Sequence, residues 1–159
     1  MSNNLNNLVM KKVIGLIFLM LFLISSTSTK IATSKSFVNS SLEGTWELIN
    51  RFNYDGINVT DTIQNINGYR QVKIYSKGKV MWTRYSPDDP VEWFGYGSYS
   101  NTNNELEERL EFGSETMMKI QDTIQSFKFE LQLDNDSYRQ ITTDENGNKI
   151  FSENYVRID

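Results

Sequence analysis

From Ser41 onward, aromatic or β-branched residues alternate with polar ones, and clusters of Gly, Pro, Asn and Asp interrupt the alternation. This period is that of a half-buried β-strand, and the interruptions are typical turn signals. The pattern predicts eight strands, at about 44–53, 68–76, 79–85, 92–100, 105–112, 125–133, 136–143 and 149–158. Residues 54–67 are predicted as a polar connection with a short strand at 57–60. The stretch 114–124 fits either a strand with a loop or a short helix.

The short turns between these strands favour an up-and-down meander of antiparallel strands. A meander leaves two unpaired edges, and closing the sheet into a barrel removes both. The fold class predicted is therefore all-β, an eight-stranded antiparallel up-and-down β-barrel. A β-sandwich is the alternative, and it needs longer crossovers that only 54–67 and 113–124 offer.

The alternation also assigns an inward face to most strands. The residues predicted to face inward are Trp46, Leu48, Phe52, Val72, Ile74, Leu106, Leu110, Phe112, Phe127, Phe129, Leu131 and Leu133. Glu108 has the same parity as Leu106 and Leu110, and an unpaired buried charge costs several kcal/mol. An inward Glu108 thus predicts a cationic partner, for which Arg84 is the candidate. The alternative is a register break that leaves Glu108 in solvent.

The N-terminal residues have a different composition. Lys11 and Lys12 precede an apolar run at 13–24, and small residues follow it. This order is typical of a secretory signal, and the run is shorter than the ~20 residues of a membrane-spanning helix. We predict a signal peptide at 1–28, a flexible linker at 29–41 and one domain at 42–159, exported to the periplasm or secreted. An uncleaved membrane anchor is the alternative, and it would be the protein's sole membrane contact.

Charge and composition narrow the function. Two of the 16 basic residues lie in 1–28 and none of the 20 acidic ones, so the remainder carries a net charge of −6. This charge argues against a nucleic-acid partner. The chain has no Cys and no His, which excludes a Ser-His-Asp triad, a Cys-His pair and a zinc site of the usual type.

Acidic residues offer little further chemistry. The segments 134–136 and 144–148 have oxygen ligands that suit calcium, but Asp, Asn and Gly at these points are also ordinary turn residues. The glutamates of 105–111 show no pair that differs from a solvated strand face. We therefore predict no enzymatic activity, no catalytic residue, no metal site and no cofactor.

Two short motifs support a family resemblance. Gly44-Thr45-Trp46 opens the first predicted strand, and Tyr155-Val156-Arg157 closes the last one. Over about 42–158 the chain resembles the lipocalins and their calycin relatives, and more specifically the lipocalin-like domains of exported bacterial proteins. The resemblance implies that Gly44, Trp46 and Arg157 close one end of the barrel, with Arg157 lying over the Trp46 ring.

A barrel of this size is either packed solid or holds one small ligand. For the hollow case we predict a non-catalytic binding protein for a small, mostly apolar ligand. The predicted lining is Trp82, Phe94, Tyr96, Glu108, Phe127 and Phe129. For the solid case, exposed Trp93 and Tyr85 beside the 87–90 loop would bind a protein or a cell-surface polymer. The sequence predicts no oligomeric state.

Overall fold

The structure is a computed structural model that describes residues 41–159. The predicted signal peptide at 1–28, and all of the predicted linker except Ser41, lie outside the described residues. Within 41–159, no helix has the length and apolar character needed to cross a bilayer.

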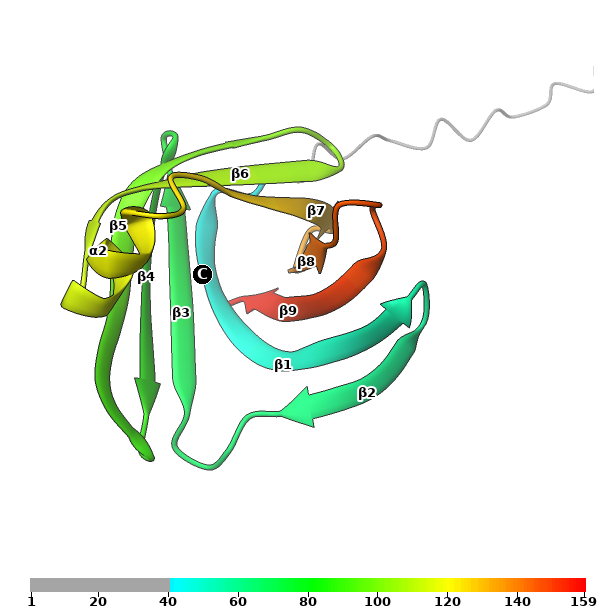
Figure 1. The fold of residues 1–159 in the computed structure, drawn as a ribbon, viewed down its shortest axis with the longest axis horizontal. Coiled ribbons are helices and arrows are strands. Elements are labelled where there is room, and N and C mark those ends of the chain that lie inside the picture. Colours follow the sequence, from blue (N-terminus) through cyan, green and yellow to red (C-terminus); the bar gives the residue numbers. More distant parts are fainter. Residues whose placement is uncertain (1–40) are drawn as a thin grey trace, which may run out of the picture. The chain divides into compact units, whose positions relative to one another are not determined.

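The described residues form one nine-stranded antiparallel sheet and a short helix (Figure 1). The elements are β1 (Gly44–Gly56), β2 (Val59–Gln64), β3 (Arg70–Ser76), β4 (Lys79–Ser86), β5 (Asp89–Asn101), β6 (Glu105–Gly113), α2 (Glu115–Gln121), β7 (Phe127–Leu133), β8 (Ser137–Thr143) and β9 (Lys149–Arg157). All eight predicted strands are present. The connection at 54–67 adds β2, which is longer and lies further along the chain than the predicted 57–60.

The sheet closes into a ring. Strands β3 to β9 pair in sequence order, and β1 pairs with both β3 and β9. Eight strands therefore make a closed circuit, as an up-and-down meander with hidden edges requires. The ninth strand, β2, pairs with β1 alone and lies outside the circuit.

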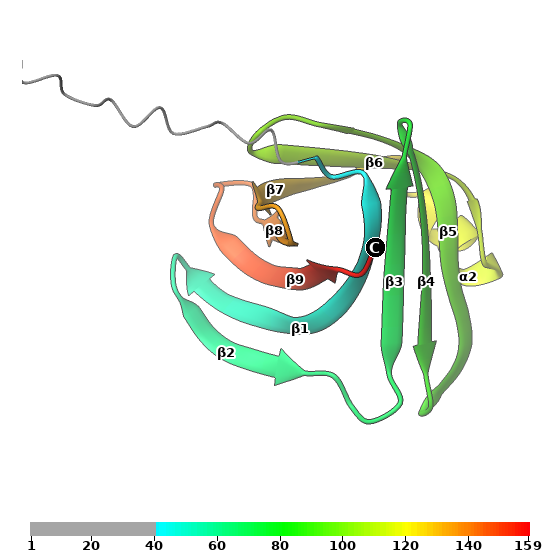
Figure 2. The ribbon, with the colours of Figure 1, turned by 180° about the vertical axis from the view of Figure 1, so that it is seen from behind.

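Strand β1 changes neighbours along its length. Its first part, Gly44–Glu47, pairs with β3, whereas Asn50–Tyr54 pairs with β2. It keeps β9 on its other side from Trp46 to Gly56. Figures 1 and 2 show the result from opposite sides: β1 starts beside β3 and then curves away from it. The ring is therefore tightly hydrogen-bonded at one end of the β1–β3 pair and split at the other.

The open stretch at 114–124 contains a helix rather than a strand. Ser114 caps α2, because its hydroxyl accepts a hydrogen bond from the Met117 N–H. Glu115 in the first turn and Lys119 in the last turn have the charges that a helix dipole favours. The cap and the packing of α2 against β5 and β6 bury Met117.

The predicted inward face of 68–76 is wrong by one residue. Gln71, Lys73 and Tyr75 are buried inside the ring, whereas Ile74 is 43% exposed. The apolar pattern misled because the inward residues of β3 are the polar ones. Their polar groups are bonded to one another inside the ring.

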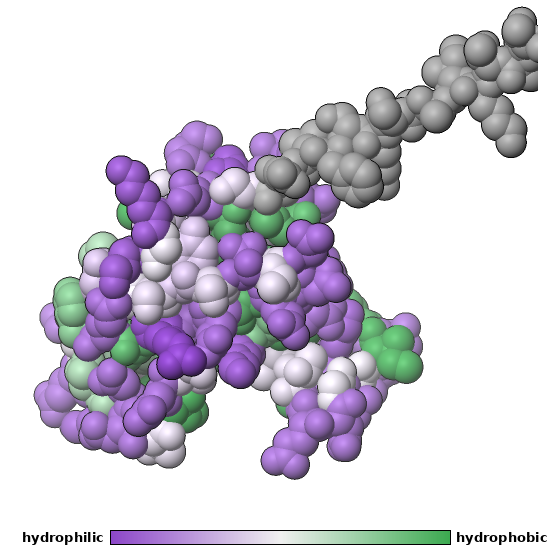
Figure 3. All heavy atoms as spheres, turned by 90° about the horizontal axis from the view of Figure 1, so that it is seen from above, coloured by the Kyte–Doolittle hydropathy of each residue, from purple (hydrophilic) through white to green (hydrophobic). Residues whose placement is uncertain are grey.

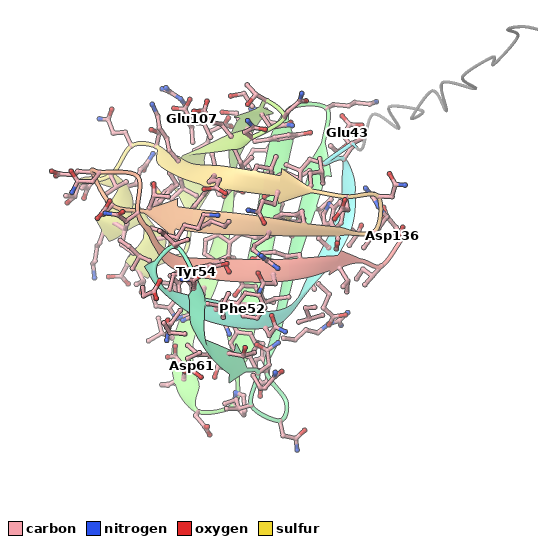
Figure 4. The ribbon with its side chains drawn as sticks, turned by 90° about the vertical axis from the view of Figure 1, so that its right-hand side faces the viewer. Glu43, Phe52, Tyr54, Asp61, Glu107 and Asp136 are labelled. Atoms are coloured by element: carbon pink, nitrogen blue, oxygen red, sulfur yellow. The ribbon has the colours of Figure 1, made fainter. Side chains whose placement is uncertain are left out.

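Bulges shift two further positions. On β6, Leu110 pairs with Gly97 but Phe112 pairs with the next residue, Tyr96, so Glu111 is an extra residue and Phe112 turns outward. Phe112 is 55% exposed instead of buried. A similar extra residue at Ile49 on β1 moves Phe52 out of phase with Trp46 and Leu48. Figure 4 shows Phe52 and Tyr54 along β1, where Phe52 packs under Arg139 of β8.

Candidate functional site

One end of the ring interior is packed around an indole. Trp46 is fully buried, its Nε1 donates to the Leu42 carbonyl oxygen at 2.8 Å, and the Tyr138 ring meets it edge-on at 4.9 Å. The apolar core residues gathered here are Leu42, Trp46, Leu48, Tyr75, Val80, Leu106, Leu131, Tyr138 and Tyr155. This end of the ring is filled by side chains.

Arg157 of β9 covers that indole. Its guanidinium carbon lies 4.1 Å from the centre of the Trp46 ring, which is the contact that the family resemblance implies. Its nitrogens donate to three carbonyl oxygens, those of Ser41, Glu43 and Asn135. Gly44 has φ +136°, and a Cβ there would lie 2.1 Å from Arg157 Nη1, so only glycine leaves room for the guanidinium.

The other half of the interior is hollow. A cavity of about 200 Å³ lies among β3 to β9 and α2. Its apolar wall consists of Val80, Trp82, Trp93, Leu110, Met117, Phe127 and Phe129. Its polar lining consists of Gln71, Lys73, Arg84, Glu108, Arg109, Gln140 and Glu153. The structure thus places an aromatic wall opposite a set of polar and charged groups.

Of the predicted lining residues, Trp82, Glu108, Phe127 and Phe129 border the cavity. Tyr96 also borders it, but its ring packs against exposed Phe112 at 5.0 Å and under the Lys79 ammonium. Phe94 does not line the cavity. The error is one of phase: on β5 the inward positions are Trp93, Gly95 and Gly97, which the alternation of aromatics on both faces concealed.

The glycines of β5 provide space for a neighbour. A Cβ on Gly95 would lie 2.8 Å from Trp82 Nε1 and 2.8 Å from Leu110 Cδ1. The missing side chain is therefore filled by the Trp82 indole, which it seats against the cavity wall. Gly97 lies at the bulge, where a Cβ would meet the Arg109 carbonyl oxygen at 2.0 Å.

Sequence reasoning identified Glu108 as inward but named the wrong partner. Lys73 Nζ lies 2.9 Å from Glu108 Oε1 and 3.1 Å from Oε2, and both side chains are less than a tenth exposed. Arg84 instead pairs with Asp89 at 3.1 Å. The inward parity of Lys73 was missed because Val72 and Ile74 were taken as the core face of that strand.

The Lys73–Glu108 pair is part of a larger network, called here the polar floor: Gln71, Lys73, Glu108, Gln140, Glu153 and Tyr155. Lys73 donates its third hydrogen bond to Gln140 Oε1 at 2.9 Å. Gln71 Nε2 donates to the Tyr155 hydroxyl at 2.6 Å, and that hydroxyl donates to Glu153 at 2.6 Å. Tyr75, in the packed end, donates to Glu108. The polar floor therefore lies where the packed and hollow halves meet.

The ionisation of this region is fixed. Burial raises the pKa of the Tyr75 and Tyr138 hydroxyls well above the usual value of 10.0, and the Glu108 carboxylate raises both further. Burial does the same to the Tyr155 pKa, with Glu153 as the second cause. These tyrosines are neutral hydrogen-bond donors at neutral pH. Lys73 balances Glu108 in charge, so the polar floor favours an uncharged polar group over an extra ion.

The split between β1 and β3 is closed by side chains. Arg51 donates to Asn65 Oδ1 at 3.0 Å and to the Tyr69 hydroxyl, and its guanidinium lies 4.7 Å from the Tyr69 ring centre. Arg51 Nε is 3.9 Å from Glu153. The arginine therefore joins the polar floor to the loop before β3, at the point where the backbone ladder is missing.

Arg84 and Trp93 form the opposite rim of the cavity. The Arg84 guanidinium carbon lies 4.2 Å from the Trp93 ring centre. Asp89 accepts from Arg84 Nη2 at 3.1 Å and from Trp93 Nε1 at 2.9 Å. The Val91 backbone N–H, then Trp93 and Arg84, lower the pKa of Asp89. A stacked arginine and indole are thus held by one carboxylate.

The acidic segments 134–136 and 144–148 lie in the turns β7–β8 and β8–β9. Asp144 accepts hydrogen bonds from the backbone N–H groups of Asn146 and Asn148, which is the usual role of Asp in a turn. Within residues 41–159, no group of three or more acidic side chains has the proximity that a metal site needs.

Comparisons with known proteins add a likeness of fold alone. No protein-family model and no curated protein matches the chain. The structure is similar to the crystal structure of an uncharacterized protein from Bacteroides eggerthii DSM 20697, at 15% identity over 74% of this chain and 100% of that one, with a TM-score of 0.47. A likeness of this size carries no argument about function, so the function must be argued from the site.

Proposed function

We propose that the protein is an exported, lipocalin-like β-barrel that binds one small, mostly apolar ligand without catalysing a reaction. The observation that carries the proposal is the cavity of about 200 Å³ with an aromatic wall and a polar floor. Concave, mainly apolar sites with a few placed polar groups are the usual form of small-molecule sites. The closed ring and the Trp46–Arg157 contact support the barrel assignment.

The cavity volume limits the ligand. A cavity of about 150 Å³ lined by aliphatic and aromatic side chains holds one benzene molecule. The volume here is about 200 Å³, which is room for a single ring with a short substituent. A long-chain fatty acid is too large for this space. We therefore expect ligands of roughly 8 to 12 non-hydrogen atoms, at the lower end of the pocket sizes that proteins use.

The lining suggests how the ligand lies. Trp82, Phe127 and Phe129 offer ring faces and edges, which favour stacked or edge-on aromatic contacts. No Cys or His is present to act as nucleophile or base, and Lys73 is held in an ion pair. The protein supplies burial and orientation, and the ligand leaves unchanged.

The proposal is tested by titrating residues 41–159 with cumene and with palmitate in a calorimeter. We expect saturable one-to-one binding of cumene and none of palmitate. A variant that fills the cavity, Val80→Phe, should abolish cumene binding, since Val80 is buried and lines the space. Absence of saturable binding by cumene and by other single-ring compounds would contradict the proposal.

The matched control is Met81→Phe. Met81 is the next residue of β4, has the opposite parity and is half exposed. The added ring therefore lies outside the cavity, and we expect cumene affinity to stay at the wild-type value. Loss of binding in both variants would show that β4 tolerates no added bulk and that the cavity is not the cause.

The surface-binding alternative receives less support. Tyr85 is 64% exposed beside the 87–90 turn, but Trp93 lines the cavity and is held by Asp89. In the face that Figure 3 shows, apolar residues form small separate patches among hydrophilic ones. A docking face usually has a contiguous apolar centre. We therefore propose the carrier function alone.

A further inference from the structure

The polar floor has little left to offer a ligand. All three N–H groups of Lys73 are used, two by Glu108 and one by Gln140. The Tyr155 hydroxyl donates to Glu153, and the Gln71 amide donates to Tyr155 and Glu153. A ligand group that accepts a hydrogen bond would have to break one of these bonds to bind here. Recognition of an acceptor must therefore occur elsewhere on the cavity wall.

Arg84 offers an unused donor. Among the residues that the structure describes, the buried side-chain nitrogens and oxygens without a hydrogen-bond partner are the Nε atoms of Arg84 and Arg139. Arg84 lines the cavity, whereas Arg139 lies over Phe52 away from it. A buried donor without a partner costs about 1–3 kcal/mol, and a ligand acceptor would remove that penalty.

The surroundings of Arg84 fix its orientation. Asp89 takes the hydrogen bond of Nη2, and the guanidinium plane is held over the Trp93 ring. The Asp89 carboxylate also neutralises the charge of Arg84. A neutral acceptor can thus bond to Nε without having to match a full positive charge. The neighbouring indoles of Trp82 and Trp93 supply the apolar wall for the rest of the molecule.

We propose that Arg84 is the specificity-determining residue of the cavity, and that the ligand is a single-ring aromatic compound with a neutral hydrogen-bond acceptor, such as a ketone or an ester. This inference rests on the proposed function, and it adds the chemical class and the contact. The acceptor oxygen receives the Arg84 Nε–H, and the ring lies against Trp82, Trp93 and Phe127.

The test compares acetophenone with cumene by calorimetry on residues 41–159. The two molecules have nearly the same shape, and only acetophenone carries an acceptor. We expect acetophenone to bind about tenfold more tightly, the gain of one hydrogen bond to a charged donor. The variant Arg84→Lys keeps the charge beside Asp89 but lacks Nε. It should lose that tenfold preference and leave cumene affinity within about twofold.

Arg139→Lys is the matched control, because it removes the same kind of buried Nε at a site outside the cavity. We expect it to retain the preference for acetophenone. Equal affinities of the wild-type protein for both compounds would overturn the role of Arg84 while the proposed function stands. A preference that survives in Arg84→Lys would also overturn it. Failure of both compounds to bind would overturn both proposals. The wild-type comparison decides even if Arg84→Lys does not fold.

Discussion

The two halves of the ring interior use tryptophan in opposite ways. Trp46 is enclosed on every side, with Tyr138 at its edge and Arg157 over its face. Trp82 and Trp93 each have one side against protein and one side against the cavity. The same side chain fills space in one half and borders it in the other. The difference shows that the strand ladder closes the ring, whereas the residues facing inward decide which part is hollow.

The glycines sharpen this contrast. Gly44 leaves room for Arg157 to cover an indole, and Gly95 leaves room for an indole to lean back from the cavity. In both cases the missing Cβ is filled by a neighbour at close range. Glycine in a strand therefore sets where large side chains lie, and the cavity remains open because Trp82 occupies the space over Gly95.

The largest expected effect separates the two kinds of tryptophan. Trp46→Ala should lower the free energy of unfolding by about 4 kcal/mol, because it leaves a cavity in a packed core. Trp82→Ala should cost about 2 kcal/mol, since Trp82 already borders empty space. Urea denaturation followed by circular dichroism measures both. Equal losses would contradict the difference between the packed and hollow halves.

The junction between the halves should be nearly as sensitive. Lys73→Met leaves the Glu108 carboxylate buried without its partner, so we expect a loss of about 3 kcal/mol. The double variant Lys73→Met with Glu108→Leu removes both charges and should recover part of that loss. Chemical denaturation of the two single variants and the double variant gives the coupling. Additive losses would show that the pair is not energetically linked.

The lids of the two halves should differ as well. Arg157→Met removes a stacked guanidinium with three hydrogen bonds to backbone carbonyls, and we expect it to cost about 2 kcal/mol. Arg84→Met removes a partly exposed ion pair and should cost less than about 1 kcal/mol. Thermal unfolding midpoints would rank the two variants. A larger loss for Arg84→Met would reverse the assignment of structural and binding roles.

The smallest effect concerns pH. Tyr75, Tyr138 and Tyr155 have pKa values raised by burial, so the folded protein holds their protons where the unfolded chain releases them. Their contribution to stability is complete below the unfolded pKa of about 10 and is lost as the pH rises above it. Between pH 9 and pH 10 we expect a loss of about 1 kcal/mol for the three together. Tyr138→Phe should make the slope shallower, and an unchanged slope would contradict burial as its cause.

The order of the strands could be predicted from the sequence because period-two alternation and turn residues are local signals. The Trp46 end was also accessible, since Gly44-x-Trp46 and Arg157 stand in the first and last strands. The inward phase of β3 was not, because Gln71 and Lys73 face inward through a polar network that no local pattern reveals. The bulge at Glu111 likewise depends on the pairing with β5, which the alternation in β6 alone does not show.

The cavity lining followed the same division. Phe127 and Phe129 lie in a strand of clean alternation, and their inward phase could be predicted. Trp93 and Phe94 are adjacent and both aromatic, so only the pairing with β4 decides which of them faces the cavity. Arg84 could be placed on the right face, but its unused Nε becomes visible only when its partners Asp89 and Trp93 are located.

The three tryptophans of the chain provide the most direct test. Their indole N–H signals in a ¹H–¹⁵N NMR spectrum report separately on the two halves during a titration with cumene. The account predicts saturable shifts of the Trp82 and Trp93 signals and no shift of the Trp46 signal. No saturable change at any of the three, or an equal change at Trp46, would contradict a ligand site in the hollow half.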